Sequence, residues 1–302
     1  MKYIKKLFGG IDMTWKRLLV LSVLAGVIPG VLLCIPFLEN TSLTDCGASY
    51  EWWIFLAIVI ITNCKKPLEA ACKTFVFFLI SQPLIYLVQV PFCWLHWGIF
   101  SYYPPWFLQT LLTFPGAFLG WFVTKKKWYS LLILSPMLTL LASTCMSYLH
   151  GTVYNPPWHI LTELFCVAVM FVLVLGIFED KKLITIGCIL NIALLTAFFF
   201  TTVYGKPHAS SNINFRGSYT QLDPDITYTA VSSDDDIVKV IYDKDSEPHG
   251  WQAEFYKKGT AEITMTGDDG SILVFEATFD DNYQIDFKLK EQYAAPDNKE
   301  AP

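Results

Sequence analysis

Charged residues are scarce in this sequence. They make up 16% of its 302 residues, against 53% apolar residues and a mean hydropathy of +0.40, whereas a soluble domain carries about 25% charged residues. This composition excludes an ordinary soluble enzyme, and the abundance of apolar residues excludes a disordered or collagen-like chain. Eight cysteines are too dilute for a disulfide-stapled miniprotein. The composition therefore predicts a membrane protein.

Motifs that mark catalysis or nucleotide binding are also missing. The sequence has no Gly-x-Ser-x-Gly, no His-Glu-x-x-His, no Cys-x-x-Cys and no nucleotide-binding loop. In the apolar part, basic residues are confined to the loops between apolar runs. We therefore expect neither nucleotide nor nucleic-acid binding, and no cofactor.

The charge that is present is unevenly placed. Residues 1–204 hold 13 Lys/Arg and 8 Asp/Glu (13 − 8 = +5), and residues 205–302 hold 9 and 19 (9 − 19 = −10), which sum to −5. The first part consists of apolar runs and the second has none long enough to cross a bilayer. We predict a membrane domain over 18–204 after a short segment 1–17, followed by an acidic soluble domain over 205–290 and a disordered tail over 291–302.

Seven apolar runs predict a bundle of seven transmembrane helices. All but the second reach the roughly 20 residues that a helix needs to cross about 30 Å of hydrocarbon. The second contains Glu51, and on length alone it could be re-entrant. The first is too long for a signal-peptide core and is expected to be a retained anchor. The runs are 18–38, 48–64, 74–93, 105–124, 128–149, 157–178 and 183–204.

Loop charges favour seven crossings over six. The loops 39–47, 94–104 and 150–156 contain no Lys or Arg, and by the positive-inside rule they lie outside the plasma membrane. The N-terminus is then cytoplasmic and the C-terminal domain extracytoplasmic. A six-helix chain would put Lys65 and Lys66 on the wrong side. The basic residues of the other loops are Lys2, Lys5, Lys6, Lys16, Arg17, Lys65, Lys66, Lys73, Lys125, Lys126, Lys127, Lys181 and Lys182.

The outer ends of the second, fourth and sixth runs resemble one another. Tyr50, Tyr102 and Tyr154 are spaced 52 residues apart, and each precedes a tryptophan at a helix start. This spacing is typical of three repeated helical hairpins. The alternative is that any two spanning helices with short loops occupy about 50 residues.

Polar residues inside the runs are the candidate site, because burying them in a bilayer is costly. His159 and Glu163 are four residues apart on one helical face. Together with His96 and His150, which are also on the outer side, they could form a proton or metal site. The alternative is that Glu163 hydrogen-bonds His159 or a neighbouring helix and only fixes packing.

Buried amides and helix-interrupting prolines permit a transporter. Gln82, Gln109 and Asn191 lie within apolar runs, where an amide either bonds a neighbouring helix or contacts a substrate. Prolines inside helices free backbone carbonyls and allow kinks, and transporters use such breaks at binding sites. These prolines are Pro29, Pro83, Pro115 and Pro136.

The C-terminal part predicts an all-β domain. Short runs of alternating apolar and polar residues recur every 8 to 12 residues between Asp, Gly, Ser and Pro clusters, which is typical of an antiparallel sandwich. A small barrel is the alternative. The expected strands are 226–232, 237–243, 251–256, 260–266, 272–279 and 283–289, with an earlier one near 214–220.

Two segments of this part resemble the bacterial Ig-like domain, group 2. They are Ser-Ser-Asp-Asp-Asp-Ile-Val-Lys-Val at 232–240 and Lys-Lys-Gly-Thr-Ala-Glu-Ile-Thr-Met-Thr at 257–266, followed by Asp269-Gly270. The resemblance covers about 222–290 and departs from the family at the long acidic segment 242–250. It implies a bacterial Ig-like β-sandwich outside the membrane, often a spacer or adhesive module. It identifies no ligand.

Two further features of the sequence are a possible disulfide bond and possible calcium sites. Cys46 and Cys93 flank outer loops, where a disulfide is an open alternative to two free thiols. The acidic runs 234–236, 268–269 and 280–281 could bind calcium or a cationic partner, although none has the spacing of a calcium loop. Aspartates in turns more often cap the turns.

Three functions follow as expectations. The first is a non-enzymatic protein of the bacterial cell envelope whose Ig-like module binds an envelope component or a partner protein. The second is a transporter or a transport-system subunit. The third is an outward-facing membrane enzyme that uses His159 and Glu163.

Overall fold

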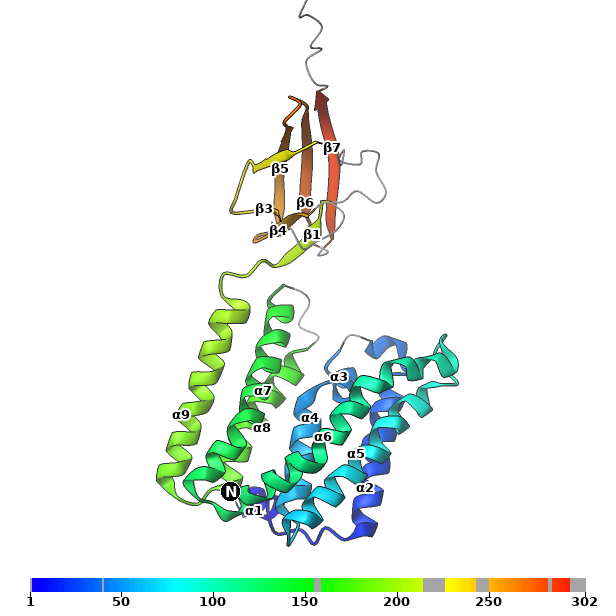
Figure 1. The fold of residues 1–302 in the computed structure, drawn as a ribbon, viewed down its shortest axis with the longest axis vertical. Helices are drawn as coiled ribbons and strands as arrows, with labels where there is room; N and C mark the ends of the chain where they lie inside the picture. Colours follow the sequence, from blue (N-terminus) through cyan, green and yellow to red (C-terminus); the bar gives the residue numbers. More distant parts are fainter. Residues whose placement is uncertain are drawn as a thin grey trace, which may run out of the picture. The chain divides into compact units, whose positions relative to one another are not determined.

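The chain divides into two compact units, Met1–Val203 and Tyr204–Pro302. The computed structural model describes residues 2–39, 41–154, 159–213, 226–242, 250–281 and 284–293. Its first unit is helical and its second consists of β-strands (Figure 1). The division between the two units falls between Val203 and Tyr204, and the sequence predicted a boundary between 204 and 205.

Among the described residues of the first unit, six helical segments are long and apolar enough to cross a membrane. This identifies a membrane protein with a helical membrane part. They are Trp15–Leu32 (α2), Pro67–Gln89 (α5), His96–Lys125 (η2, His96–Tyr102; α6, Tyr103–Gly120; η3, Trp121–Lys125), Trp128–Thr152 within α7 (Trp128–Tyr154), Ile160–Ile177 (α8) and Lys181–Val203 (α9, Lys181–Phe198; η4, Phe199–Val203).

The second predicted run, 48–64, forms one short helix, α4 (Tyr50–Thr62), and another short helix, α3 (Ser42–Ala48), lies in the predicted outer loop before it. After η1 (Pro36–Leu38), α3 and α4 are separated by Ser49, whose backbone is extended. At 13 residues, α4 is about 20 Å long, shorter than the hydrocarbon core. Its sequence is nevertheless strongly apolar, and its second half is buried within the bundle.

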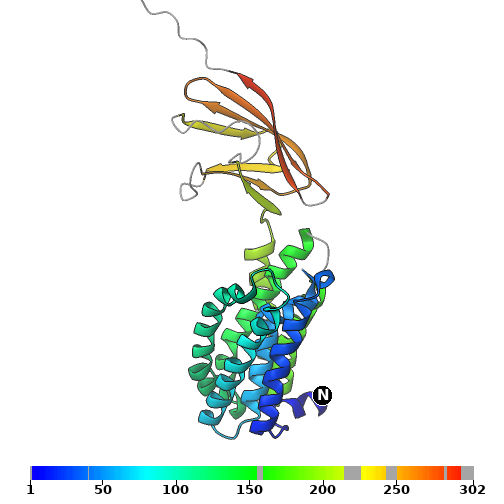
Figure 2. The same cartoon turned by 90° about the vertical axis from the view of Figure 1, so that its right-hand side faces the viewer.

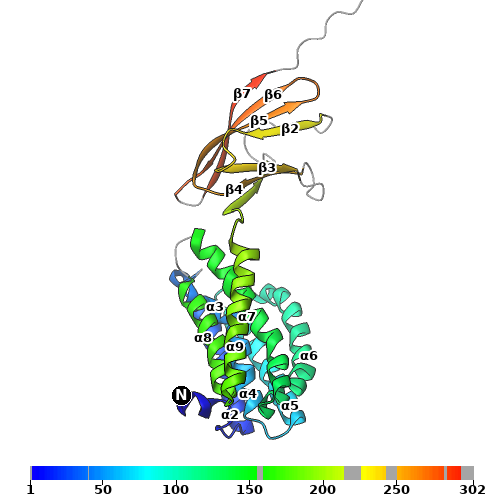
Figure 3. The same ribbon diagram turned by 90° about the vertical axis from the view of Figure 1, so that its left-hand side faces the viewer.

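The two ends of α4 nevertheless contact opposite ends of the helical unit. Beyond its C-terminus, Asn63 Oδ1 accepts hydrogen bonds from the backbone of Gly9 (3.2 Å) and Ile11 (2.7 Å) in the segment after α1 (Lys2–Leu7). At its N-terminus, the Tyr50 hydroxyl accepts a hydrogen bond from Gln109 Nε2 of α6 at 3.3 Å. With the short α3 left out, the helices α2, α4, α5, α6, α7, α8 and α9 alternate in direction (Figures 1 and 3).

Small residues let α2 approach α5 closely. A Cβ added at Gly26 would lie 2.6 Å from the Ser81 carbonyl oxygen and 2.7 Å from Leu84 Cβ, and one at Gly30 would lie 3.0 Å from the Ile85 carbonyl oxygen. Glycines four residues apart are a common way to bring two membrane helices into backbone contact. They hold α2 against the rest of the bundle.

The lysine-bearing loops gather at one end of the helical unit, here named the lysine end. There Phe8 packs on Gly176, and Lys126 Nζ lies 2.5 Å from Glu179 Oε1. Val203, the last residue of the unit, packs instead against Cys145 and Cys166. The chain therefore leaves the helical unit at the end opposite the lysines.

In the part of the second unit that the structure describes, seven strands form two antiparallel sheets (Figures 2 and 3). One sheet has the order β1-β4-β3 and the other β2-β5-β6-β7. The strands are Ala209–Asn212 (β1), Tyr228–Ser232 (β2), Val238–Tyr242 (β3), Trp251–Phe255 (β4), Gly259–Gly267 (β5), Ile272–Phe279 (β6) and Ile285–Tyr293 (β7).

Alternating side chains from both sheets form one core. Along β6 every second residue is buried, as the alternation in the sequence predicted. Phe255 of β4 lies 5.7 Å from Phe279 of β6 and 6.2 Å from Phe287 of β7, measured between ring centroids. The two sheets therefore pack face to face across a shared apolar layer, as in a β-sandwich.

The strand order can be compared with the constant-type immunoglobulin sandwich. In that arrangement the fifth and sixth strands lie in different sheets, whereas here β5 and β6 are paired from Gly259↔Phe279 to Thr266↔Ile272.

The strand predicted near 214–220 lies outside the described residues. Of the predicted tail, 291–293 belong to β7, and 294–302 lie outside the described residues.

Candidate functional site

A buried carboxylate in α3 forms the centre of a polar cluster in the helical unit. Helix α3 starts with a capping box, in which Thr41 and Thr44 satisfy each other's backbone N–H groups. This short helix places Asp45, which is 7% exposed, beside the N-terminus of α8. The cluster lies at the end of the unit opposite the lysines.

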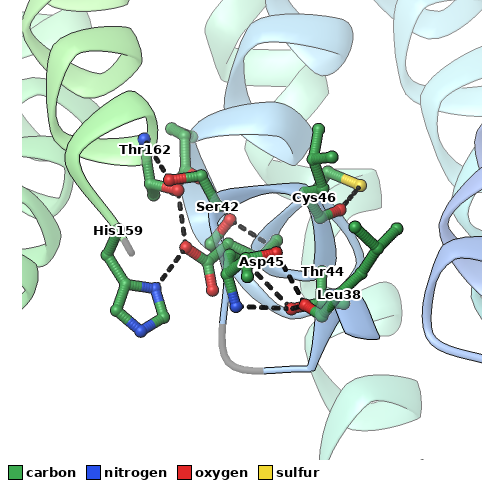
Figure 4. Close-up of polar contacts among 11 residues, drawn as sticks. Leu38, Ser42, Thr44, Asp45, Cys46, His159 and Thr162 are labelled. Atoms are coloured by element: carbon green, nitrogen blue, oxygen red, sulfur yellow. Dashed lines mark hydrogen bonds and ion pairs between the residues drawn. The ribbon is translucent and has the colours of Figure 1, made fainter. Parts of the chain in front are cut away.

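Asp45 Oδ2 accepts two side-chain hydrogen bonds from α8 and the residue before it (Figure 4). His159 Nδ1 lies 2.8 Å away and Thr162 Oγ1 lies 2.5 Å away. The Thr162 backbone N–H donates in turn to Ser42 Oγ at 3.2 Å. These bonds join α3 to α8 across more than 110 residues of sequence.

The imidazole of His159 is oriented by this carboxylate. Because a carboxylate can only accept, the contact with Asp45 assigns a proton to Nδ1, and in the neutral form of the ring Nε2 is then an acceptor. In Figure 4 the second ring nitrogen points away from Asp45. The Tyr148 ring lies 5.3 Å from the imidazole, and the side chain of His159 is 25% exposed. The arrangement is chemically that of a general base held by an acid.

A second buried carboxylate, Glu51, lies in the first turn of α4. It is fully buried, and its Oε1 accepts a hydrogen bond from Ser49. Within the described part of the chain, Glu51 Oε2 has no hydrogen-bond partner. The Ser49 hydroxyl also lies 2.6 Å from the Asp45 backbone carbonyl oxygen, so Ser49 connects the Glu51 carboxylate to the backbone of α3.

The predicted His159–Glu163 pair is replaced by the His159–Asp45 pair. Glu163 is in the first turn of α8, and its Oε1 is buried with no partner among the residues described. His96 is exposed in the segment between α5 and α6, where its Nδ1 lies 3.3 Å from the Val90 carbonyl oxygen. His150 is in the last part of α7. The described residues contain no group of three or more His, Cys, Asp or Glu that could hold a metal ion.

The three predicted amides have different environments. Asn191 of α9 donates from Nδ2 to the Met170 carbonyl oxygen of α8 at 2.9 Å, which is a bond between helices. Gln109 donates to Tyr50, as noted above. Gln82 is 2% exposed, and its Nε2 has no partner in the described ranges. Only Gln82 and Gln109 lie together, on the wall of one cavity.

Cys46 and Cys93 are both free thiols. Each hydrogen-bonds a nearby backbone carbonyl, Cys46 to Leu43 at 3.0 Å and Cys93 to His96 at 3.7 Å. Burial, together with the negative charges of Asp45 and Glu51, raises the pKa of Cys46 to about 11. The thiolate that would react is therefore scarce at neutral pH.

The acidic runs of the β unit cap turns. Asp234 Oδ1 accepts from the Asp236 backbone at 2.9 Å, and Asp280 Oδ1 accepts from the Gln284 backbone at 2.8 Å. Asp269 Oδ1 accepts from both the backbone and the hydroxyl of Ser271. These bonds match the turn-capping alternative to a calcium site.

Asp45, Thr162 and Ser42 were not singled out by the sequence. Asp45 lies in a loop that reads as an ordinary polar connection, and Thr162 resembles any threonine in a membrane helix. The available signal was an acid in an outer loop that lacks Lys and Arg.

No protein-family model matches this chain, and neither the curated proteins nor the solved structures contain a significant match to it.

Proposed function

We propose that this is a bacterial plasma-membrane protein that crosses the bilayer seven times and carries an Ig-like β domain on its outer surface, where the domain binds an envelope component or a partner protein. One observation carries the proposal: the lysine loops meet at one end of the helical unit, and Val203 leaves it at the other. The positive-inside rule then assigns the exit of the chain to the outer face.

The seventh crossing of this proposal is α4. Its end contacts support the assignment, because Asn63 bonds the segment after α1 at the lysine end and Tyr50 bonds α6 at the opposite end. Burial among longer helices removes the need for α4 itself to match the hydrocarbon thickness. An odd number of crossings puts the two ends of the chain on opposite sides.

A binding role suits the β unit. It has its own apolar core and an acidic sequence with a net charge of −10 over 205–302, from 9 basic and 19 acidic residues. The resemblance to bacterial Ig-like domains supports an adhesive or spacer module. A surface of this charge favours a partner that carries cationic groups, since complementary charge speeds encounter and selects partners.

Crosslinking in intact cells tests this role. A membrane-impermeant, amine-reactive crosslinker is applied to cells that carry the full chain, and to cells in which 205–302 is replaced by an unrelated β-sandwich. The proposal expects a discrete crosslinked partner only with the native domain. Absence of a partner, together with an unchanged phenotype after deletion of 205–302, would contradict it.

The His159–Asp45 pair supports a second candidate function, an outward-facing membrane enzyme. The 2.8 Å contact orients a partly exposed imidazole as a base at the end of the helices opposite the lysines. It differs from the enzyme expected from sequence in that Asp45, rather than Glu163, orients the imidazole.

Complementation of a deletion strain tests the second candidate. His159→Gln keeps an amide that can donate to Asp45 but provides no base, so an enzyme of this kind loses its activity in that variant. Asp45→Asn leaves the imidazole in place with a weaker orienting bond and is expected to retain partial activity. Full complementation by His159→Gln would exclude base catalysis by this residue.

A further inference from the structure

A cavity of about 750 Å³ lies at the lysine end of the helical unit. Its wall is formed by α1 and the two glycines that follow it, by the C-terminal ends of α4 and α8, and by the end of η3 with the lysine after it. Its volume is within the ~300–1,000 Å³ of small-molecule sites. The cavity is at the opposite end of the unit from the Asp45–His159 cluster and is separate from it.

Helix α1 is held in place beside this cavity and packs on the end of α8 (Figure 3). Phe8 contacts Gly176 of α8 and is 7% exposed. Asn63 holds the chain on both sides of Phe8, because its Nδ2 donates to the Leu7 carbonyl oxygen at 2.6 Å and its Oδ1 accepts from the Gly9 backbone at 3.2 Å. The lysines of α1 are therefore positioned by the fold at the cavity wall.

Three lysines line the cavity: Lys5 and Lys6 of α1, and Lys126 after η3. Lys126 Nζ lies 2.5 Å from Glu179 Oε1. Lys5 and Lys6 form no ion pair within the described part of the chain, and none of the described wall residues is acidic. The wall therefore carries an excess of positive charge.

This positive charge already acts on the nearest acid. The hydrogen bond from Lys126, together with the positive charges of Lys126 and Lys5, holds the pKa of the Glu179 carboxyl below its ordinary value. Lysines gathered on one wall also repel one another. An anion inside the cavity would be attracted by the lysines in the same way as Glu179 and would reduce their repulsion.

The composition of the wall indicates the kind of anion. Phosphate oxygens are common partners of lysine ammonium groups, and basic pockets at the ends of membrane helices bind the head groups of anionic lipids. Phe8 and Ile177 make part of the wall apolar, and Tyr3, which is 88% exposed, also lines it. A phosphate attached to an organic group fits this wall better than a bare inorganic ion does.

We propose that this cavity binds a phosphate group between the ammonium groups of Lys5, Lys6 and Lys126. Two sources share this chemistry: the head group of an anionic phospholipid at the lysine end of the helices, and a soluble phosphate compound. Binding requires neither the β domain, nor the His159–Asp45 pair, nor a particular orientation of the chain in the membrane.

Titration of the full-length protein in neutral detergent with dioctanoyl phosphatidylglycerol, followed by native mass spectrometry at fixed ionic strength, tests the proposal. We expect one saturable site, with binding weakened about ten-fold or more by Lys5→Gln/Lys6→Gln. Lys65→Gln/Lys66→Gln is the matched control, because it removes the same charge from two exposed lysines outside the wall. It should weaken binding less than about two-fold.

Equal weakening by the two double variants would overturn the proposal, because binding would then be a general attraction to the lysine end. Binding that does not saturate would also overturn it. In that case the lysines only neutralise the C-terminal ends of α4 and α8, which carry partial negative charge.

Two further variants separate binding from folding. Lys5→Arg/Lys6→Arg keeps both charges and should retain the affinity to within about three-fold. Glu179→Gln removes the acid that pairs with Lys126 and should strengthen binding about two-fold or more, an effect that partial unfolding does not produce. Weaker binding by Glu179→Gln, with an unchanged melting temperature, would overturn the part assigned to Lys126.

Inorganic phosphate distinguishes the two sources. Its binding to the same protein is measured by the rise in melting temperature at constant ionic strength, with sodium chloride as the control. Tighter binding of the lipid assigns the cavity to a phospholipid head group, and tighter binding of inorganic phosphate assigns it to a soluble phosphate compound. Failure of both probes to bind saturably would overturn the proposal.

Discussion

His159 Nδ1 lies 2.8 Å from Asp45 Oδ2, and this contact joins a short helix to the start of a membrane helix 114 residues later. Asp45 is buried and also accepts a hydrogen bond from Thr162. Through these two hydrogen bonds, the buried Asp45 carboxylate holds α3 against the start of α8. The stability of the helical unit should therefore depend on it.

Asp45→Ala is expected to destabilise the protein by about 1–3 kcal/mol, because the variant loses charged hydrogen bonds and leaves His159 and Thr162 without their acceptor. Thermal melting in detergent, followed with a thiol-reactive dye that reports exposure of the buried Cys145 and Cys166, measures the loss. Glu39→Ala, at an exposed acid, is the control and should change little. An equal melting temperature for both variants would contradict the anchoring role.

Gly26→Leu is expected to prevent α2 from packing on α5, because a Cβ at this position already lies 2.6 Å from the Ser81 carbonyl oxygen. The loss should exceed about 3 kcal/mol, since backbone rather than a side chain must move. Size-exclusion chromatography and protease resistance in detergent check the result. Val20→Leu, at an exposed position of the same helix, is the matched control.

The β unit is expected to fold when residues 205–302 are expressed alone, because the described side chains of its core all belong to the unit itself. Phe275 is 1% exposed, so Phe275→Ala should cost about 3–5 kcal/mol in urea unfolding. Val231→Ala, at a 68% exposed residue, should cost little. A non-cooperative transition for the unaltered domain would contradict its independence.

Acid should lower the stability of the β unit by protonating the carboxylates that pair with Lys290. The Lys290 ammonium lies 2.8 Å from both Glu262 and Glu276, and it holds the pKa of Glu276 below its ordinary value of 4.5. A lowered carboxylate pKa stabilises the folded state above pH 4.5, and this contribution is lost as the pH falls through the lowered value. Lys290→Met should therefore flatten the dependence of stability on pH below 5. Lys206→Met, at an exposed lysine, should leave that dependence unchanged.

Strands β2 to β7 were largely predictable from the sequence, whereas β1 was not. Alternation of apolar and polar residues gave β2 to β7 to within a few residues, because every second side chain enters the core. The segment Ala209–Asn212 is short and mostly polar. It forms a strand through backbone pairing with β4, from Ala209↔Phe255 to Asn212↔Gln252, which local sequence does not reveal.

The membrane part shows a similar division. Hydropathy located the long helices, but the second run conceals the extended Ser49, which separates α3 from α4. The site depended on distant contacts: His159 was recognised as an unusual residue, but its partner Asp45 could not be found without knowing that α3 packs on α8. The sequence pattern shows which polar side chains lie in apolar segments and are therefore costly to bury. Which of these side chains contact one another depends on how the helices pack.

Labelling of single cysteines in spheroplasts tests the central claim most directly. Val231→Cys places a thiol on the exposed surface of β2, and Lys126→Cys places one in a lysine loop. Each is made in a variant whose eight native cysteines, all in the helical part, are replaced by alanine. A membrane-impermeant maleimide should modify Cys at position 231 in intact spheroplasts, and Cys at position 126 only after lysis. Modification of position 126 in intact spheroplasts, with position 231 protected until lysis, would contradict an exported β domain.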